Sequence, residues 1–434
     1  MGDSDKSTRI RVCVIGAGAA GLCAARHLAS ETRNFEPAVF EQQNDVGGTW
    51  IYEEKIGLDD HGYPIHSSMY ANLRTNLPLK LMSFPDYLTL GQSTDAACGT
   101  HQDVLHYLHD YADHFQLRQY IQFNTRVECV RPVINADHWK KTSWKVRVRN
   151  IKTQVLEEKD FDAVVICNGH FFEPDIPLIP GIETFPGSVM HSHEYRKPDQ
   201  FEGKRVIVLG ASSSGIDIGI EVAGKASHVY LSHNHERLNG SLPYNMTQVA
   251  GVEKISNKQF TLRDGTNVEV DSFIYCTGYK YTFPFLDESC SIKIDENYVS
   301  PLYKHLVNVE HPSMCIVGIP TTVIPFALFH MQIKYYLRVL RGKVSLPTKA
   351  EMLEDSKLKS TNKRHAHTLG NQQFDYNDDL AISGSFERLP AYYKNGYLAW
   401  HEARAGNLLN YKDSKFVILP DNVNVQITPA TLPA

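Results

Sequence analysis

Three glycines near the N-terminus have the spacing of a phosphate-binding turn. In "IRVCVIGAGAAGLCAARHLA", Gly16, Gly18 and Gly21 directly follow an apolar run, and Glu41 ends the next apolar segment, "PAVFE". In this G-x-G-x-x-G pattern the first glycine makes the turn, the second admits a pyrophosphate and the third allows close helix packing. An acid about 20 residues further on can bind two ribose hydroxyls. These residues predict a dinucleotide site with an unmodified ribose.

A second glycine turn occurs in "KRVIVLGASSSGIDIGIEV". Gly210 and Gly215 take the first and third positions, while Ser212 replaces the middle glycine. The next strand, "HVYLS", ends without an acid, and polar or cationic side chains there can accommodate a 2'-phosphate. This pattern favours NADPH over NADH, although a surface loop with incidental histidines remains an alternative. The predicted coenzyme contacts are Gly210, Ser212, Ser213, Ser214, Gly215, Ser232 and Arg237.

The elements around these turns predict the architecture. Apolar strands "FDAVVICNGH" (161–170) and "VDSFIYCTGY" (270–279) each end in a glycine turn, and Thr277 and Gly278 are expected beside a cofactor. A later strand, "MCIVGIP", and the helix-like "PFALFHMQIKYYLRVLRG" return the chain to the first unit. We predict an α/β fold with two dinucleotide-binding, Rossmann-like domains, the NADPH domain inserted in the FAD domain. The boundaries are 1–176 and 272–434 for the FAD domain, which ends in a helical tail, and 177–271 for the NADPH domain.

Composition excludes several classes of partner. The 434 residues are 42% hydrophobic and carry a formal net charge of −5, so neither nucleic acid nor a membrane surface is an expected partner. No apolar run reaches the length of a membrane span. We expect a cytoplasmic protein, or a secreted one if a signal peptide has been removed. Whether the protein forms a homo-oligomer is left open.

The positions of the cysteines and histidines predict neither a redox-active cysteine pair nor a metal site. None of the eight cysteines has a C-x-x-C neighbour, which opposes a pyridine-nucleotide disulfide reductase. The segment "HQDVLHYLHDYADHF" (101–115) contains four histidines, but its apolar stripe is typical of a packed helix. Metal ligands need one shared face and an ordered outer shell, so we predict no metal here.

One motif identifies a family resemblance. "FPGSVMHSHEYR" (185–196) resembles the F-x-G-x-x-x-H-x-x-x-Y-[KR] signature of flavin-containing monooxygenases, and "GGTW" (47–50), "ICNGHFFEP" (166–174) and "CTGY" (276–279) are also similar to that family. Within it, "NLRTNLPLKLMSFPD" (72–86) resembles the insect enzymes that N-oxygenate pyrrolizidine alkaloids. Because three prolines interrupt residues 180–198, we interpret the signature as a connector that couples two domains.

The resemblance implies the reaction and its residues. An FAD- and NADPH-dependent monooxygenase transfers one oxygen atom of O2 from a flavin hydroperoxide to a small-molecule nucleophile, an amine or a sulfide. Asn76 matches the active-site asparagine of the family, and a neutral amide can donate hydrogen bonds without supplying a labile proton. Gly48 and Trp50 are expected near the flavin. The alternatives without a catalytic or binding role are that Asn76 is a turn residue and that Trp50 is a core residue.

Three functions remain open. N-oxygenation of tertiary amine alkaloids leads, S-oxygenation of thiols or thioethers by the same mechanism is the alternative, and a non-oxygenating NADPH-dependent flavoprotein reductase is the third.

Overall fold

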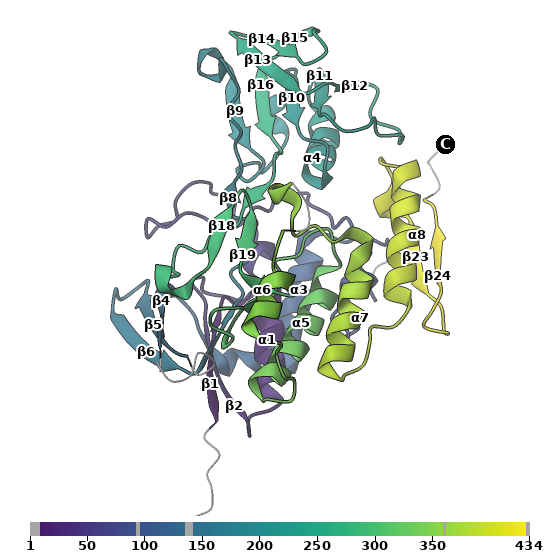
Figure 1. Ribbon diagram of the computed structural model, residues 1–434. Coiled ribbons are helices and arrows are strands. Elements are labelled where there is room, and N and C mark those ends of the chain that lie inside the picture. The colour runs from purple at the N-terminus through teal and green to yellow at the C-terminus, as the bar shows by residue number, and fades with distance from the viewer. Residues whose placement is uncertain (1–8, 93–95, 135–141, 359–361, 431–434) are drawn as a thin grey trace, which may run out of the picture.

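Two sheets, one in each of two lobes, carry the two glycine turns (Figure 1); the second is parallel, and the first is parallel except for its edge strands β20 and β21. The structure is a computed structural model that describes residues 9–92, 96–134, 142–358 and 362–430. The sheet of the first lobe has the strand order β20-β21-β22-β7-β1-β2-β3. Its strands are β1 (Ile10–Ile15), β2 (Phe35–Phe40), β3 (Ile121–Gln122), β7 (Ala163–Ile166), β20 (Leu302–Tyr303), β21 (Val307–Asn308) and β22 (Met314–Ile316).

Alternating side chains of β1 supply two cores. Val12 and Val14 pack against the helical layer of α1 (Ala19–Ala29), α3 (His101–His114) and α5 (Pro325–Leu340). Cys13 and Ile15 pack on the other side, against the antiparallel strands β4 (Thr125–Val133), β5 (Ser143–Asn150) and β6 (Leu156–Phe161). Because β2 and β7 flank β1 on opposite sides, the first glycine turn lies at the point where α/β sheets bind ligands.

The second lobe repeats this layering. Its parallel sheet has the order β12-β11-β10-β16-β9, with α4 (Ser213–Ala223) on one face. A small antiparallel sheet covers the other face. The strands are β9 (Ser188–His191), β10 (Arg205–Leu209), β11 (His228–Ser232), β12 (Met246–Val249) and β16 (Ser272–Tyr275) in the parallel sheet, and β13 (Val252–Ser256), β14 (Gln259–Leu262) and β15 (Asn267–Glu269) in the small one.

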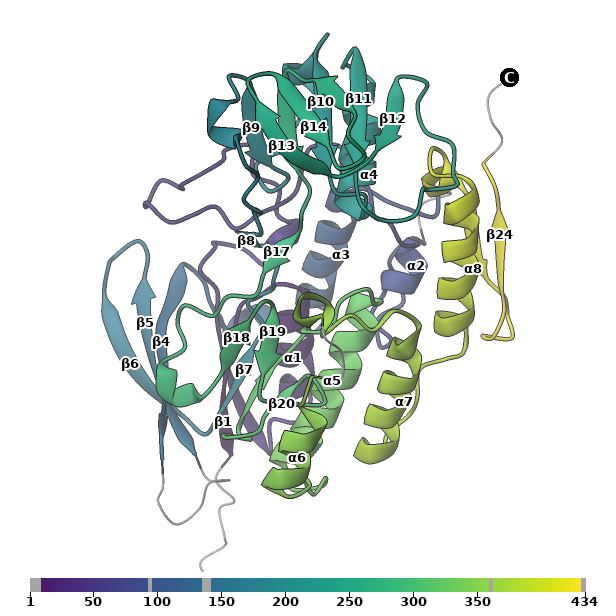
Figure 2. The same cartoon turned by 45° about the horizontal axis from the view of Figure 1, so that its top comes forward.

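The second lobe is inserted in the first, as the sequence predicts. Between β7 and β20 the chain crosses to the second lobe and returns, and the two crossings pair as β8 (Glu173–Pro174) and β17 (Tyr279–Lys280) (Figure 2). The predicted boundary at residue 271 is too early, because β16 is hydrogen-bonded to β10 within the second sheet. The turn "CTGY" ends that strand and therefore closes the second unit.

The signature stretch is not only a connector. Its residues 188–191 form β9, which pairs in parallel with β16 at the edge of the second sheet. The prolines at 186 and 198 flank this strand and do not interrupt it, and a proline before an edge strand costs no ladder hydrogen bond.

The C-terminal segment packs beside the first lobe and reaches toward the second (Figures 1 and 2). It contains α6 (Lys349–Asp355), α7 (Gln373–Gly384) and α8 (Tyr392–Gly406), and it adds the hairpin β23 (Lys415–Ile418) and β24 (Val425–Thr428) to the predicted helices. Among the described residues, no helix has both the length and the apolar character needed to cross a membrane.

Candidate active site

The first glycine turn leaves room for a ligand at one position only. A Cβ at Gly16 would lie 2.7 Å from the Cys167 carbonyl oxygen, and one at Gly21 would lie 1.8 Å from the Gly16 carbonyl oxygen. At Gly18 the nearest atom would be the Gly48 Cα at 3.5 Å, an ordinary contact. The protein's own packing therefore requires Gly16 and Gly21. Gly18 instead keeps open the approach that a pyrophosphate would use, so the turn fits FAD.

Glu41 lies beside this turn at the end of β2. Its carboxylate is buried and accepts hydrogen bonds from the backbone N–H groups of Ala17 (2.6 Å) and Gln43 (2.8 Å). Burial raises the pKa of Glu41, and these N–H groups oppose that shift. The carboxylate is thus fixed next to the glycine loop, where a ribose would lie, with lone pairs left for hydroxyl donors.

The second glycine turn has the same construction. Gly210 has a φ of +112°, and its Cβ would lie 2.3 Å from the Cys276 carbonyl oxygen, while the Cβ of Gly215 would lie 1.8 Å from the Gly210 carbonyl oxygen. Ser212, the N-cap of α4, and Ser214 are exposed, and no side chain caps the helix. The first-turn N–H groups are therefore available to a phosphate.

The loop after β11 contains the predicted 2'-phosphate contacts. Ser232 is fully buried, and its hydroxyl donates to the Ala250 carbonyl oxygen at 2.8 Å, so its side chain holds the strand and offers no surface to a coenzyme. His233 is also buried, beside Gln248. Arg237 is exposed on this loop, as are Asn234 and His235, and its contact with a 2'-phosphate stays a prediction.

The other predicted contacts lie at the edges of the two turns. Thr277 donates its hydroxyl to the Asp175 carbonyl oxygen at 2.5 Å, which ties the two crossings together. Gly278 has a φ of +86° with open space on its Cβ side. Gly48 lies directly against Gly18, since a Cβ at Gly48 would be 2.9 Å from the Gly18 Cα. Trp50 is half-buried and packs against the core of the first lobe.

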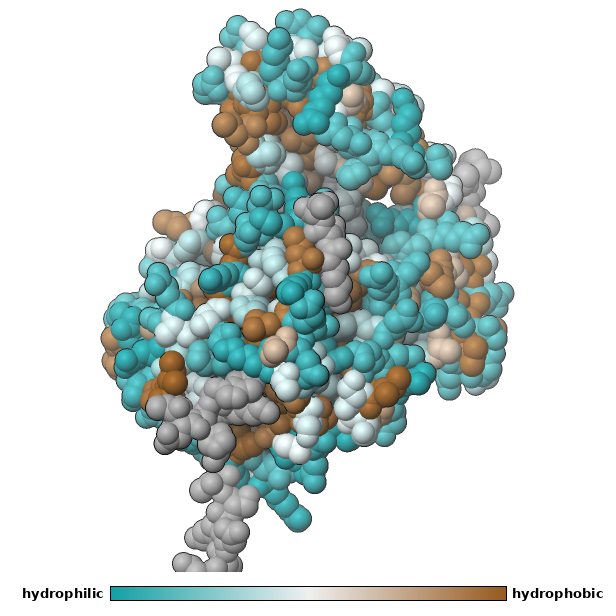
Figure 3. All heavy atoms as spheres, viewed as in Figure 1, coloured by the Kyte–Doolittle hydropathy of each residue, from teal (hydrophilic) through white to brown (hydrophobic). Residues whose placement is uncertain are grey.

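Asn76 lies at the junction of the lobes. Its exposed side-chain amide, on the loop before α2 (Leu79–Met82), donates to the Ser213 hydroxyl in the first turn of α4 at 3.0 Å. The Trp400 indole on α8 donates to the Asn76 carbonyl oxygen at 2.9 Å. The Asn76 amide, from the first lobe, is therefore held beside the start of α4 in the second lobe. Figure 3 shows the notch between the lobes on one face of the molecule.

A polar interface that the sequence did not reveal holds α4 in this position. Asp217 contacts both the Tyr70 hydroxyl and the Lys412 ammonium group, and the Asn72 amide donates to Glu221 at 2.7 Å. Asp217 and Lys412 are 195 residues apart, so no local pattern could pair them.

Arg196, the last residue of the signature, joins the two lobes. It is buried, and its guanidinium donates to carbonyl oxygens that include those of Glu53 (2.6 Å), His193 (2.7 Å) and Ser67 (3.3 Å). Burial lowers the pKa of Arg196. His191 accepts from the His193 backbone N–H at 3.1 Å. These contacts support a coupling role for the signature.

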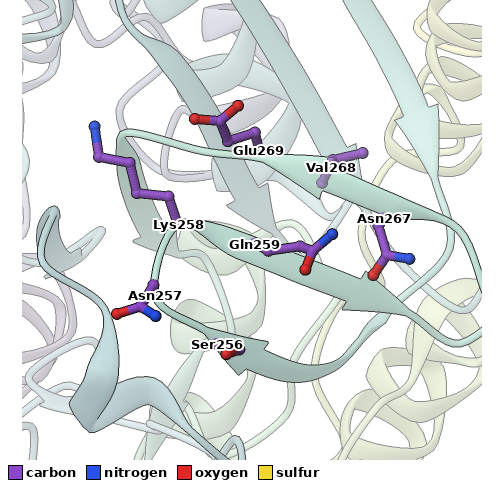
Figure 4. A pocket seen from close by; sticks show the side chains of 7 residues that line it. All are labelled: Ser256, Asn257, Lys258, Gln259, Asn267, Val268 and Glu269. Carbon is purple, nitrogen blue, oxygen red and sulfur yellow. The ribbon is translucent and has the colours of Figure 1, made fainter.

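Two other regions lie outside the predicted cofactor contacts. A hollow of about 500 Å³ lies on the small sheet β13–β15, on the far side of the second sheet from α4, and is lined almost entirely by polar side chains (Figure 4). On α5, Phe326 stacks on Phe84, and Gln332 accepts from the Gly318 N–H at 2.9 Å. Phe326 and Gln332 are thus buried inside the first lobe.

Two glycine turns with this construction, joined at one junction, define a flavoprotein with two dinucleotide-binding domains. Residues 9–241 and 236–384 match the family described as "FMO-like: Flavin-binding monooxygenase-like". The chain belongs to this family of flavin monooxygenases, and FAD and NADPH are its cofactors.

Relatives and solved structures agree with this assignment. The chain is 38% identical to "Flavin-containing monooxygenase FMO GS-OX3" of Arabidopsis thaliana, over 85% of this chain and 83% of that protein. It resembles the structure of S-allyl-L-cysteine S-oxygenase from Allium sativum (TM-score 0.85, 34% identity, 94% and 96% of the two chains). It also resembles Tmm from Pelagibacter sp. strain HTCC7211 (TM-score 0.83, 27% identity, 98% and 97%).

Proposed function

We propose that this enzyme oxygenates a soft nucleophile, nitrogen or sulfur, in a small molecule. The observation that carries the proposal is the Asn76 amide, which contacts the start of α4 where the two cofactor sites meet. Bound FAD supplies the redox chemistry, because NADPH reduces it and the reduced form activates O2. Asn76 contributes a neutral N–H donor that stabilises the activated oxygen without protonating it.

Other residues of the chain prepare this site. Trp400 fixes the backbone of Asn76, and the contacts of Asp217 fix the helix that presents Ser213. Gly18 leaves the approach of one pyrophosphate open, and the first-turn N–H groups of α4 are available to the other. Closing the lobes over the cofactors excludes water, which otherwise releases activated oxygen as hydrogen peroxide.

The substrate class divides into two candidates. Tertiary amines, such as pyrrolizidine alkaloids, are favoured by the resemblance of residues 72–86 to the insect N-oxygenases. Thioethers are favoured by the relative named as an S-oxygenase. The test is a substrate panel of a pyrrolizidine alkaloid, a simple tertiary amine, an allyl thioether and a ketone, with product and NADPH consumption measured together. Stoichiometric N-oxide or S-oxide identifies the class, whereas NADPH consumption without any oxygenated product would favour the non-oxygenating reductase.

Replacing Asn76 should separate reduction from oxygenation. In Asn76→Ala we expect flavin reduction by NADPH to remain close to normal, while oxygenated product falls by roughly 100-fold and hydrogen peroxide rises, because one donor to the activated oxygen is lost. The measurement is hydrogen peroxide per NADPH at saturating substrate, beside a rapid-mixing trace of flavin reduction. Asn267→Ala, which removes an exposed amide on β15, on the far side of the second sheet from α4, is the matched control and should stay coupled. Full coupling in Asn76→Ala would make Asn76 a turn residue.

A further inference from the structure

Three donor side chains meet between α1 and α5, away from the cofactor sites. Cys23 and His27 are four residues apart and therefore share one face of α1, and His330 faces them from α5. One ligand atom from each lies within 4.8 Å of the others. His27 lies nine residues beyond Gly18, about 13 Å along the helix at 1.5 Å per residue. The cluster is thus separate from the pyrophosphate turn.

The two imidazoles already have the spacing of metal ligands. His27 Nε2 and His330 Nδ1 are 3.2 Å apart. Two nitrogens bound to a tetrahedral zinc ion at 2.0–2.1 Å are roughly 3.3–3.4 Å apart. Cys23 is fully buried and His330 is 6% exposed, so neither donor has to be taken out of water on binding.

Asp86 lies beside this group of three. It lies on the loop after α2, and its Oδ1 is 3.7 Å from His330 Nδ1. Both of its carboxylate oxygens are shielded from solvent, and neither accepts a hydrogen bond from any residue that the structure describes. Arg26 Nε lies 3.4 Å from Oδ2 and forms an ion pair with Asp86, so one cation is already beside the carboxylate. Because its oxygens accept no hydrogen bond, they keep lone pairs for a metal ion.

We propose that Cys23, His27, His330 and Asp86 bind one zinc ion that fastens α1 to α5. A set of one sulfur, two nitrogens and one oxygen suits zinc, whereas magnesium and calcium prefer all-oxygen sets. Four protein ligands leave no open position, so the site is structural. Thiolate and carboxylate together balance the charge of Zn²⁺, and the thiol proton of Cys23 is released to solvent. The donor atoms of Cys23, His27 and His330 must close by up to about 1 Å to reach tetrahedral spacing, and the Asp86 carboxylate, which lies outside this group, must move further.

The competing arrangement is a metal-free hydrogen bond between the two histidines. The test begins with FAD-loaded enzyme expressed with zinc in the medium and passed through gel filtration. We expect about one zinc ion per chain by elemental analysis, and a lower midpoint of thermal unfolding after treatment with a zinc chelator. Cobalt loading should give the visible bands of tetrahedral thiolate coordination at wavelengths longer than those of the flavin.

Variants then assign the ligands. Cys23→Ser and His330→Gln should each lower the zinc content at least tenfold while keeping bound FAD. Cys129→Ser and His106→Gln are the matched controls and should retain zinc, because these side chains lie outside the cluster. The proposal is overturned if the wild-type enzyme holds no zinc and gives no cobalt bands, or if Cys23→Ser retains zinc as the controls do. The wild-type measurements decide even if a variant fails to fold.

Discussion

Gly18 and Gly21 are three residues apart, yet a methyl group should act differently at each. Gly18→Ala meets only an ordinary contact inside the protein, so we expect the apoprotein to keep its stability and the Kd for FAD to rise at least tenfold, about 1.4 kcal/mol. Gly21→Ala forces α1 away from the Gly16 carbonyl oxygen and should lower the free energy of unfolding by about 2–3 kcal/mol. Flavin content and urea unfolding of the apoproteins measure the two effects. Equal loss of stability in both variants would contradict the assignment of Gly18 to the ligand.

Arg237 is the residue that should set coenzyme preference. In Arg237→Ala we expect the KM for NADPH to rise by about 10- to 100-fold, the value of one charge-assisted contact of ~1.5–3 kcal/mol, with little change for NADH. The exposed Lys254 lies on β13, on the other side of the second sheet, and Lys254→Ala is the control. Equal changes for both coenzymes would place Arg237 outside the phosphate site.

At the scale of elements, the position of α4 depends on a side chain from the C-terminal segment. We expect Lys412→Met to leave Asp217 without its cation, to weaken NADP⁺ binding and to raise the peroxide released per NADPH. In a double-mutant cycle with Asp217→Asn, the effects of the two substitutions on the free energy of NADP⁺ binding should be non-additive by about 0.5–3 kcal/mol. Lys394→Met, at an exposed site on α8, serves as the control. Strict additivity would show that the two side chains act independently.

A second element-scale prediction concerns the ends of β10 and β16. Arg205 and Lys258 donate to Asp271 at about 3.0 Å each and hold the pKa of this carboxyl well below its usual range. A lowered pKa stabilises the fold above the unfolded value of about 3.9 and loses that contribution as the pH falls through the folded value. Asp271→Asn should therefore lower the free energy of unfolding by about 1 kcal/mol at pH 7. This difference in stability between variant and wild type should shrink below about pH 4. A difference that is constant from pH 7 to pH 3 would contradict this linkage.

At the scale of the whole molecule, two similar lobes are combined so that each supplies what the other lacks. Each has a mainly parallel sheet with helices on one face and a three-stranded sheet on the other. We expect Glu41 of the first lobe to bind an unmodified ribose and Arg237 of the second to bind a 2'-phosphate. The paired crossings β8 and β17 and the buried Arg196 connect the lobes.

The sequence by itself determined the two nucleotide units, their order and the insertion of one in the other. Glycine spacing and apolar strands are local patterns, and the requirement for glycine at 16, 21, 210 and 215 arises from contacts within each turn and with the strand that ends beside it. The family signature gave the reaction class by the same local means.

Only the tertiary structure decided how the units meet. It placed Asn76 on Ser213, paired Asp217 with Lys412, buried Ser232 and gathered Cys23, His27 and His330. It also moved the domain boundary past β16, since hydrogen bonds to a distant strand assign that strand to the second sheet. His27 and His330, for example, are 303 residues apart. These residues are close together because whole helices and strands pack against one another. A short stretch of sequence holds no information about that packing.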